Sequence, residues 1–570
     1  MSLIELTADL WLLVAAIGLA LAVQQTGLPV LGQGASVAAG AYGTALLAPL
    51  LPLPLAAALA VLLAGVAVQL LGAAATRLTA GALALGTWAL TWLVREGLTA
   101  FPLGEGGAPE VLLPQPVRLV SPSLGVAATL TPGWQVALAA AAAVTALGLT
   151  RRALRGPLGL QLAAVRAGPA LASTLGVDVA ARRRGVLAVA AALGALGGVG
   201  MIVLQGVVGP SDVGPLLSLQ LLAAVLVGGR AWWGPLVGIA VLKVALVVAD
   251  PSVAAALLLA GGLLREPIGG LLARGRVPGP EEDPPPAGDP RPSRHGGSVR
   301  VDRPRGAAAA NATPALRARG LRVVFGGLSA LDGVNLDLHA GQVHAVIGPN
   351  GSGKTTLLRV LAGALPATTG SIELSGRVLG RLAEADRVRA GVARSPQRTL
   401  LLAGFGVRRE VEVATPTGVL AGLRHLLGAR SARADATARA DAVDEALQLT
   451  GLTERGLQGG AVPVKSAAMP TREQRLLQLA RVAATGAAVL LLDEPAAGVA
   501  GGGAGLAELT SALRRLAESG RAVLLIEHDM RLVSAVADRV SVLVEGRIVA
   551  AGSPADVLAD PAVRTAYLGG

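Results

Sequence analysis

The chain has 570 residues and a formal net charge of +12; 53 % of the residues are hydrophobic, 15 % are charged and none is cysteine. This length predicts two or more domains, and so little charge indicates that at least one of them lies in the lipid bilayer. The missing cysteines exclude disulfides, iron–sulfur clusters and thiolate metal sites. We expect no nucleic-acid partner, because the arginines gather in loops and in a linker, where they suit anionic lipid equally well.

Residues 1–265 are predicted to form an all-α polytopic membrane domain of eight to ten segments, because apolar runs recur there with little charge between them. A soluble helical domain rich in Ala and Leu is the alternative, and the low charge over this length disfavours it. Glu5 and Asp9, with no basic residue before Leu10, do not suit a signal peptide, so we expect the first run to remain as a span. The expected segments are Leu10–Val23, Val30–Leu50, Leu55–Ala75, Thr79–Val94, Trp134–Leu149, Gly185–Val208, Leu217–Val227, Pro235–Val248 and Ser252–Leu264.

The arginines orient this domain. Seven of them lie between residues 149 and 185 against one acidic residue, Asp178, so we expect residues 151–184 to face the cytoplasm. The stretch 99–133 carries two glutamates and one arginine, and we expect it on the external side. Lys243 stands within an apolar segment, where a snorkelling lysine is the simpler interpretation and a functional intramembrane charge is the other.

Residues 266–312 are rich in Pro, Gly and mixed charge without periodicity, which predicts a disordered Pro/Arg-rich linker. Residues 313–570 then alternate strand-like and helical stretches, which predicts a soluble α/β domain. Its expected strands are Leu321–Val324, Val343–Ile347, Val489–Leu492, Val523–Ile526 and Val540–Val544.

A phosphate-binding loop follows the run Val343–Ile347. The sequence Gly348–Thr355 fits the pattern G-x-x-x-x-G-K-[ST], and its glycines allow consecutive N–H groups to point at phosphate oxygens. Lys354 is expected to reach the β- and γ-phosphates of a nucleotide, and Thr355 to offer its hydroxyl to Mg²⁺. A chance glycine-rich turn is disfavoured, because strand, loop and helix occur in the required order. The nucleotide-binding residues predicted here are Gly348, Asn350, Gly351, Ser352, Gly353, Lys354, Thr355 and Thr356.

Two later strands end in candidate catalytic residues. The apolar run Val489–Leu492 is followed by Asp493, a second predicted Mg²⁺ ligand, and by Glu494, a predicted general base for a water attacking the γ-phosphate. The run Val523–Ile526 is followed by Glu527 and His528. His528 could contact the γ-phosphate, although an exposed turn histidine is the simpler interpretation of that residue alone.

Together these motifs resemble the nucleotide-binding domain of ABC transporters, over residues 315–570. The resemblance implies that Phe325 stacks on adenine, that Gln397 binds Mg²⁺ and connects it to the membrane domain, and that His528 is the switch histidine. Two segments near the end, Gly552–Leu558 and Ala566–Gly569, look like the ATPases of branched-chain amino-acid importers.

The membrane half resembles the permease of the same importers. The stretch Val30–Ala35 with Gly40–Tyr42 looks like an early glycine-rich span of that family, and Leu217–Pro235 looks like a late one. The stretch Ala172–Val177 looks like the cytoplasmic loop that docks on the ATPase. The family usually has acidic residues just before this loop, whereas this chain has Gly168 and Pro169.

The signature sequence departs from the family pattern. Where the family reads Leu-Ser-x-Gly-Gln, this chain reads Met469, Pro470, Thr471, Arg472 and Glu473. In the family the serine and glycine bind the γ-phosphate held by the opposite subunit of a sandwich dimer. Pro470 has neither a hydroxyl nor an N–H, and Arg472 replaces a glycine that the phosphate must approach closely. We expect the long side chain of Arg472 to obstruct that approach; the alternative is that Arg472 supplies positive charge to the phosphate.

The resemblance therefore implies a multi-domain chain: an all-α membrane permease followed by an α/β P-loop ATPase that uses ATP and Mg²⁺. The leading hypothesis is an ATP-driven importer subunit for branched-chain or related amino acids in the plasma (inner) membrane. Its expected partners are a second permease and ATPase, in a heteromeric complex, and an external substrate-binding protein. Import of urea or short amides is an alternative, and so is an ATP-binding scaffold or regulator with weak hydrolysis.

Overall fold

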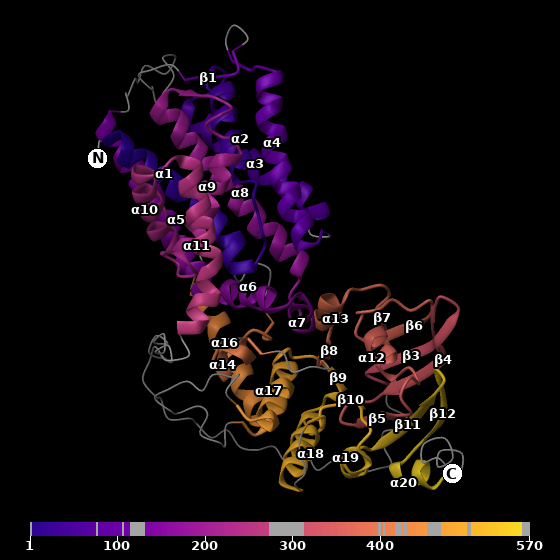
Figure 1. The fold of residues 1–570 in the computed structure, drawn as a ribbon. Coiled ribbons are helices and arrows are strands. Elements are labelled where there is room, and N and C mark those ends of the chain that lie inside the picture. The colour runs from indigo at the N-terminus through magenta and orange to yellow at the C-terminus, as the bar shows by residue number, and fades with distance from the viewer. Residues whose placement is uncertain are drawn as a thin grey trace. The chain divides into compact units, whose positions relative to one another are not determined.

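The computed structural model describes residues 3–75, 78–104, 108–113, 131–272, 313–396, 401–402, 405–416, 425, 430–452, 469–498 and 503–560. The chain divides into two compact units (Figure 1). The first comprises residues 1–166, 178–277 and 419–429, and the second comprises residues 167–177, 278–418 and 430–570.

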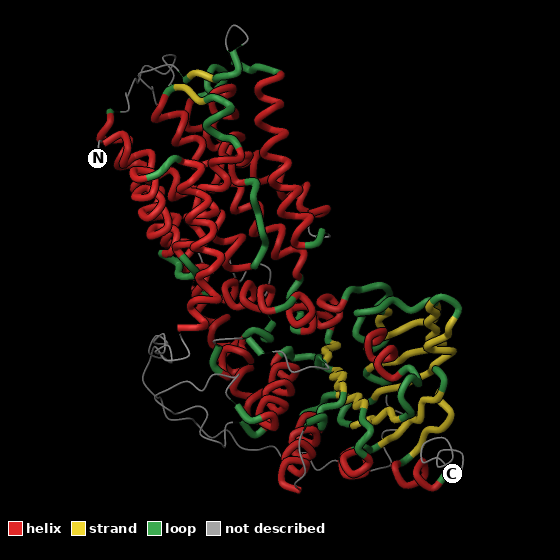
Figure 2. Tube along the Cα trace, viewed as in Figure 1, coloured by secondary structure: helices red, strands yellow, loops and turns green. Residues whose placement is uncertain are grey.

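The first unit is built almost wholly of helices (Figure 2). Each of the nine predicted apolar segments overlaps a helix. Among the described residues, four helices are long and apolar enough to cross a membrane: Leu3–Gln25, Leu53–Gly72, Pro132–Arg155 and Val179–Gln205. Its described elements are α1 (Leu3–Ala20), which continues as the π-helix η1 (Leu21–Gln25), α2 (Gln33–Leu47), α3 (Leu53–Ala75), α4 (Ala80–Ala100), β1 (Val111–Leu112), α5 (Pro132–Arg155), α6 (Pro157–Ala167), α8 (Val179–Gln205), β2 (Val207–Val208), α9 (Pro215–Gly228), α10 (Gly234–Val248) and α11 (Pro251–Leu272).

Two features of this unit differ from the sequence expectation. Helix α11 continues to Leu272, so residues 266–272 are helical rather than part of a disordered linker. Helix α6 also stands between two predicted spans, inside the arginine-rich stretch 151–184. Neither residues 266–272 nor α6 extends an apolar run of spanning length, which is why hydropathy alone did not predict them as helical.

Small residues let α8 pack closely on α1, α2 and α3. A Cβ at Gly40 would overlap the carbonyl oxygen of Ala195, and a Cβ at Gly198 would overlap that of Val37. Buried Gln33 satisfies its amide by donating to the carbonyl oxygens of Ala15 (3.0 Å) and Ala190 (3.1 Å). Small residues at helix crossings and buried amides that bridge helices are typical of membrane bundles.

The stretch that the arginines predict to be cytoplasmic and the stretch predicted to be external lie at opposite ends of α8. The Asp178 carboxylate caps its N-terminus by accepting from Ala181 N (2.9 Å), next to Arg182–Arg184. At the other end β2 pairs antiparallel with β1, in the described part of the stretch 99–133. Because 27 residues of α-helix span about 40 Å, the arginine cluster and residues 108–113 lie at opposite ends of the bundle.

Lys243 is not a lone lysine. Its Nζ lies 2.5 Å from Oδ1 of Asp9, which joins α10 to α1; the side chains are 37 % and 15 % exposed. The snorkelling interpretation is therefore replaced by an ion pair between two helices of the bundle.

The second unit is an α/β domain with two sheets. A four-stranded antiparallel sheet has the order β4-β3-β6-β7, and a six-stranded sheet has the order β12-β11-β5-β10-β9-β8. The strands are β3 (Leu316–Phe325), β4 (Leu328–Leu338), β5 (Val343–Ile347), β6 (Thr369–Leu374), β7 (Arg377–Val378), β8 (Val392–Arg394), β9 (Val489–Asp493), β10 (Ala522–Ile526), β11 (Arg539–Val544) and β12 (Arg547–Gly552).

The helices of this unit include one short segment from the arginine-rich stretch, α7. They are α7 (Pro169–Thr174), α12 (Lys354–Leu361), α13 (Glu384–Ala390), α14 (Val407–Glu412), α16 (Arg430–Thr450), α17 (Thr471–Ala484), α18 (Gly503–Glu518), α19 (Met530–Val536) and α20 (Pro554–Ala559).

A buried ion pair joins α14 to α17, with Arg481 Nη1 2.9 Å from Oε2 of Glu410. The other carboxylate oxygen of Glu410 accepts from the Leu402 N–H (2.9 Å). The pair is therefore held by a hydrogen bond as well as by charge.

Candidate functional site

The candidate site is assembled at one edge of the six-stranded sheet. Strands β5, β10 and β9 are parallel neighbours, and Ile526 is in register with both Val346 and Asp493. The chain segments that follow the three strands therefore leave the sheet side by side. They are the glycine-rich loop, the turn that carries His528, and the pair Asp493-Glu494.

The glycine-rich loop requires glycine at two positions. Gly348 has a φ of +156°, and a Cβ there would overlap the carbonyl oxygen of Leu543. Gly353 has a φ of +103°, and a Cβ there would overlap the carbonyl oxygen of Ala330 in β4. Helix α12 begins directly after Gly353, so its N-terminal N–H groups and its dipole face the concave side of the loop. Asn350 at the tip is exposed, Ser352 is buried, and Thr355 and Thr356 are half-buried.

The Lys354 ammonium bridges the loop. Its Nζ donates to the carbonyl oxygens of Gly348 (2.7 Å) and Pro349 (2.9 Å). Burial lowers the pKa of Lys354, and the carboxylates of Glu494 and Asp493 act in the opposite direction. The lysine charge is therefore held at the loop, under the influence of two acidic groups.

Asp493 is a buried carboxylate without a hydrogen bond among the residues that the structure describes. Its backbone N–H donates to Ser395 Oγ (3.1 Å), but neither carboxylate oxygen has such a partner. Arg394 Nη2 lies 3.6 Å from Oδ2 as an ion pair. Burial raises the pKa of Asp493, and Arg394 opposes that shift. Arg394 therefore compensates only in part for the burial of this carboxylate, and a further cation would stabilise it.

Glu494 stands in a strained backbone conformation. Its φ is +46°, in the left-handed region that residues with a Cβ rarely adopt. Its N–H donates to Ile526 O (2.9 Å), and its carbonyl accepts from Ala497 N (3.1 Å). Strain of this kind is common where a side chain must be presented at a functional site.

His528 and Phe325 are both accessible. The His528 side chain is 64 % exposed, with Nδ1 3.8 Å from Oε2 of Glu527. Phe325 is 49 % exposed and ends β3, opposite Leu328 of β4. Ala330, two residues after Leu328 in β4, lies against Gly353 of the glycine-rich loop. Gln397 lies outside the described residues.

The residues at the signature position form the start of α17. Pro470 occupies the N-cap without a side-chain cap, Met469 is buried and Thr471 is exposed. Arg472 does not project freely: its Nε lies 3.4 Å from Oε2 of Glu508 in α18. The half-buried Glu473 follows it in the first turn.

Models of three protein families match the chain. A branched-chain amino acid transport system permease component matches residues 6–264, an ABC transporter model matches residues 331–497, and a branched-chain amino acid ATP-binding cassette transporter model matches residues 547–570.

The high-affinity branched-chain amino acid transport ATP-binding protein LivG of Escherichia coli K12 is 36 % identical over 261 residues, 45 % of this chain and 98 % of LivG. The corresponding BraF of Pseudomonas aeruginosa has the same identity and coverage. The chain belongs to the ABC transporter family. It joins a branched-chain-type permease and an ATP-hydrolysing cassette in one polypeptide.

A crystal structure of a nucleotide-free ATP-binding cassette from an ABC transporter covers 45 % of this chain and all of its own length, at 24 % identity and a TM-score of 0.37. The match to the permease model and the apolar helices make the ABC transporter a multi-pass membrane protein, and its ATPase domain is cytoplasmic.

Helix α7 of this ABC transporter contacts α13 within the second unit. Ser173 Oγ donates to Oε2 of Glu384 (2.7 Å). Gly176 has a φ of +78°, and a Cβ there would lie 2.9 Å from Cγ1 of Val388. The predicted docking stretch 172–177 thus lies against the ATPase fold. Glu384 also lies 3.9 Å from Arg394 Nη1, so Arg394 stands between Glu384 and Asp493.

Sequence reasoning did not assign a role to Glu527 or Arg475. Glu527 is fully buried and accepts from the backbone N–H groups of Ala496 and His528. Arg475 Nε donates to the Ala497 carbonyl (3.0 Å); burial lowers the pKa of Arg475, and Glu527 and Glu494 oppose that shift. The signal for Glu527 was a carboxylate directly after a buried strand and before His528. No spacing pattern pointed to Arg475.

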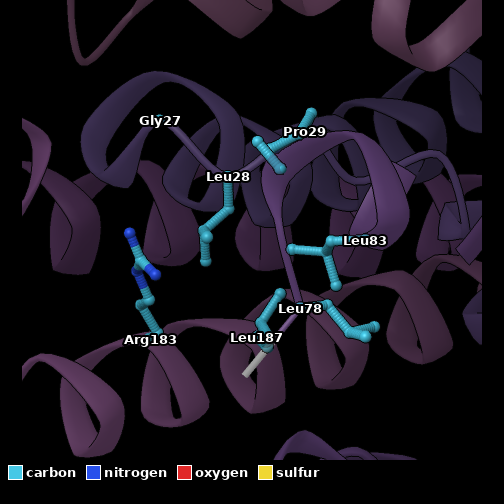
Figure 3. Close-up of a pocket in the computed structure, with 8 residues that line it drawn as sticks. Gly27, Leu28, Pro29, Leu78, Leu83, Arg183 and Leu187 are labelled. Carbon is cyan, nitrogen blue, oxygen red and sulfur yellow. The ribbon is translucent and has the colours of Figure 1, made fainter. Parts of the chain in front are cut away.

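A small cavity lies within the membrane half of the ABC transporter. It has a volume of about 50 Å³ and is lined by Arg183 and apolar residues including Leu28, Leu83 and Leu187 (Figure 3). Because about 10–15 Å³ of cavity volume is enough for one water molecule, this cavity has room for a few water molecules.

Proposed function

We propose that the chain is the fused permease and ATPase subunit of an importer of branched-chain or related amino acids. The observation that carries the proposal is the joint match of the permease model to residues 6–264 and of the branched-chain cassette model to residues 547–570 of one chain. We place its domains at 1–265, extended to Leu272 by α11, and at 313–570, with a linker between them. We place the protein in the plasma (inner) membrane.

The roles of the site residues follow from their chemistry. Lys354 and the N–H groups of Gly348–Thr356 bind the phosphates, and Phe325 stacks on adenine. Glu494 accepts a proton from the attacking water, and His528 approaches the γ-phosphate from the neighbouring turn. These assignments are supported by the shared sheet edge and by the facing charges of Lys354, Asp493 and Glu494.

The residues present fit Mg²⁺. Asp493 supplies a buried carboxylate with no hydrogen-bond partner among the described residues, and Thr355 supplies a hydroxyl at the start of α12. Hard oxygen ligands of this kind are those that Mg²⁺ prefers. We propose Thr355, Asp493 and Gln397 as the ligand set. When bound, the ion neutralises charge on the phosphate oxygens.

We further propose a heteromeric complex with a second permease and ATPase. An external substrate-binding protein delivers the substrate to this complex. Pro470 and Arg472 leave this chain without an ordinary signature, so the competent site would join its own Lys354 and Glu494 to the signature of a partner. The same observation favours the second candidate function, an ATP-binding scaffold or regulator that hydrolyses weakly.

A competition experiment tests the cargo. Uptake of labelled leucine by cells that express the complex should fall when unlabelled isoleucine or valine is added, and should not respond to urea or acetamide. Competition by urea or acetamide alone would instead support the alternative cargo. If loss of the chain changes growth in the same way with and without substrate, and no uptake is detected, the scaffold or regulator function would be supported.

A further inference from the structure

The turn after β10 and the loop after β9 share a buried carboxylate. Glu527 is completely buried, and its Oε1 accepts a hydrogen bond from the N–H of Ala496 (2.8 Å). Its Oε2 accepts from the N–H of His528 (3.1 Å) and of Asp529 (3.5 Å). One side chain thus binds backbone on both sides of the site.

The backbone that Glu527 holds includes the strained residue. Glu494 donates its N–H to Ile526 O, and two residues later Ala496 donates to Glu527. Two successive contacts therefore fix the chain on either side of the left-handed conformation at Glu494. A residue with a Cβ keeps such a conformation only when its surroundings over-determine it.

The same loop is held from a second direction. Arg475 donates from Nε to the Ala497 carbonyl and from Nη1 to Gln478 Oε1 (3.1 Å). Gln478 in turn donates to the carbonyl oxygen of Pro396 (2.8 Å), next to Gln397 in the sequence. The loop after Glu494 is thereby tied both to the His528 turn and to the helix that begins at the altered signature.

We propose that Glu527 is a positioning residue for ATP hydrolysis, whose carboxylate fastens the loop that presents Glu494 to the turn that presents His528. The inference rests on the proposed roles of Glu494 and His528. Glu527 does not touch the nucleotide in this proposal; it sets the distance between the general base and the histidine, and it does so only while both of its oxygens accept hydrogen bonds.

Replacing Glu527 by Gln tests this. The amide keeps one accepting oxygen and turns an NH₂ group toward the other backbone N–H, so one side of the clamp opens. Because small misplacements of catalytic groups cost about a hundredfold, kcat of the full chain in its membrane complex should fall about ten- to a hundredfold. The KM for ATP should stay within about twofold, since binding by the glycine-rich loop is untouched. Glu518→Gln, an exposed glutamate at the end of α18, is the matched control and should change neither value.

Double variants separate a positioning role from a general loss of structure. Glu527→Gln added to Glu494→Gln should cost nothing further, because both act on one step. If Glu494→Gln keeps full turnover, the proposed role of Glu494 fails; if Glu494→Gln is inactive while Glu527→Gln matches the control, the clamp alone is wrong.

If Glu527→Gln does not fold, amide hydrogen exchange of the unaltered protein tests the same contacts. The amide hydrogens of Ala496 and His528 should exchange slowly with solvent, as expected of hydrogen-bonded N–H groups. Fast exchange at both amides would overturn the clamp.

Discussion

The hydroxyl of Ser173 donates a hydrogen bond of 2.7 Å to the carboxylate of Glu384. Ser173 lies in α7, which comes from the arginine-rich stretch between membrane helices, and Glu384 opens α13 of the ATPase fold. Glu384 faces Arg394, which faces Asp493 in turn. A short series of charged and polar groups therefore leads from α7 to the candidate metal ligand.

Substituting Gly176 should weaken the seating of α7. Gly176→Ala places a Cβ 2.9 Å from Val388 Cγ1 at a φ of +78°, which costs about 1–2 kcal/mol from the backbone alone. We expect less substrate transported per ATP hydrolysed, with ATP binding unchanged. Gly168→Ala in the same stretch meets no atom within 4 Å and is the control. Equal transport-to-hydrolysis ratios in the two variants would show that the contact has no role in coupling.

Removing the Lys354 charge should weaken ATP binding. A charge-assisted hydrogen bond contributes about 1.5–3 kcal/mol, so Lys354→Ala should raise the ATP dissociation constant about ten- to a hundredfold. Arg359→Ala, an exposed cation one turn further along α12, should leave it unchanged. Unaltered affinity in Lys354→Ala, measured by equilibrium binding of labelled ATP, would exclude this loop as the nucleotide site.

The altered signature predicts two unequal ATP sites in a heteromeric complex. Glu494→Gln in this chain should lower turnover of the complex by about a hundredfold or more, as loss of a general base does. Pro470→Ser with Arg472→Gly should change turnover much less, because these residues serve the weaker site. A homodimer of the isolated chain with robust, Glu494-dependent ATPase activity would contradict this asymmetry.

Acid should destabilise the ATPase unit through His344. This imidazole is buried in β5, with Nε2 2.9 Å from Ser541 Oγ, and burial lowers its pKa from 6.5 to about 4. Between those two values the unfolded chain binds a proton that the folded chain does not. Stability is therefore full above pH 6.5 and falls by about 3 kcal/mol as the pH drops toward 4.

Pulse proteolysis of the full chain in urea, followed on fragments of the ATPase unit at several pH values, measures this loss. His344→Gln should flatten the dependence between pH 4 and 6.5. His339→Gln leaves the hydrogen bond to Ser541 intact and removes only a minor contribution of charge to the lowered pKa of His344, so it should keep most of the dependence of the parent. An equal slope in His344→Gln and the parent would assign the acid sensitivity to other groups.

The sequence alone was sufficient to predict the features that depend on which residues follow one another in the chain. The glycine-rich loop lies between β5 and α12, and Asp493 ends β9, as predicted, because strand, loop and helix follow one another within a few residues. The apolar segments of the membrane half were found for the same reason. The proposed roles of Phe325, Gln397, Glu494 and His528 stay predictions.

Contacts between residues that are far apart in the sequence could not be predicted in this way. The partner of Arg472 is Glu508, on another helix, so the expectation that a long side chain obstructs the signature missed the ion pair that holds it. Lys243 pairs with Asp9 across two helices, α10 and α1, that lie far apart in the sequence, and no periodicity predicts such a contact. No role was assigned to Glu527 from the sequence, because its burial and its backbone donors are visible only in the fold.

The central claim is ATP-driven import by this chain through hydrolysis at Lys354 and Glu494. The most direct measurement is accumulation of labelled leucine in proteoliposomes that contain the complex, with the substrate-binding protein and leucine on one side and ATP on the ATPase side. We predict accumulation on the ATPase side against the leucine gradient, and none when Glu494→Gln is introduced or ATP is omitted. Equilibration without ATP, movement away from the ATPase side, or full accumulation with Glu494→Gln would contradict the account.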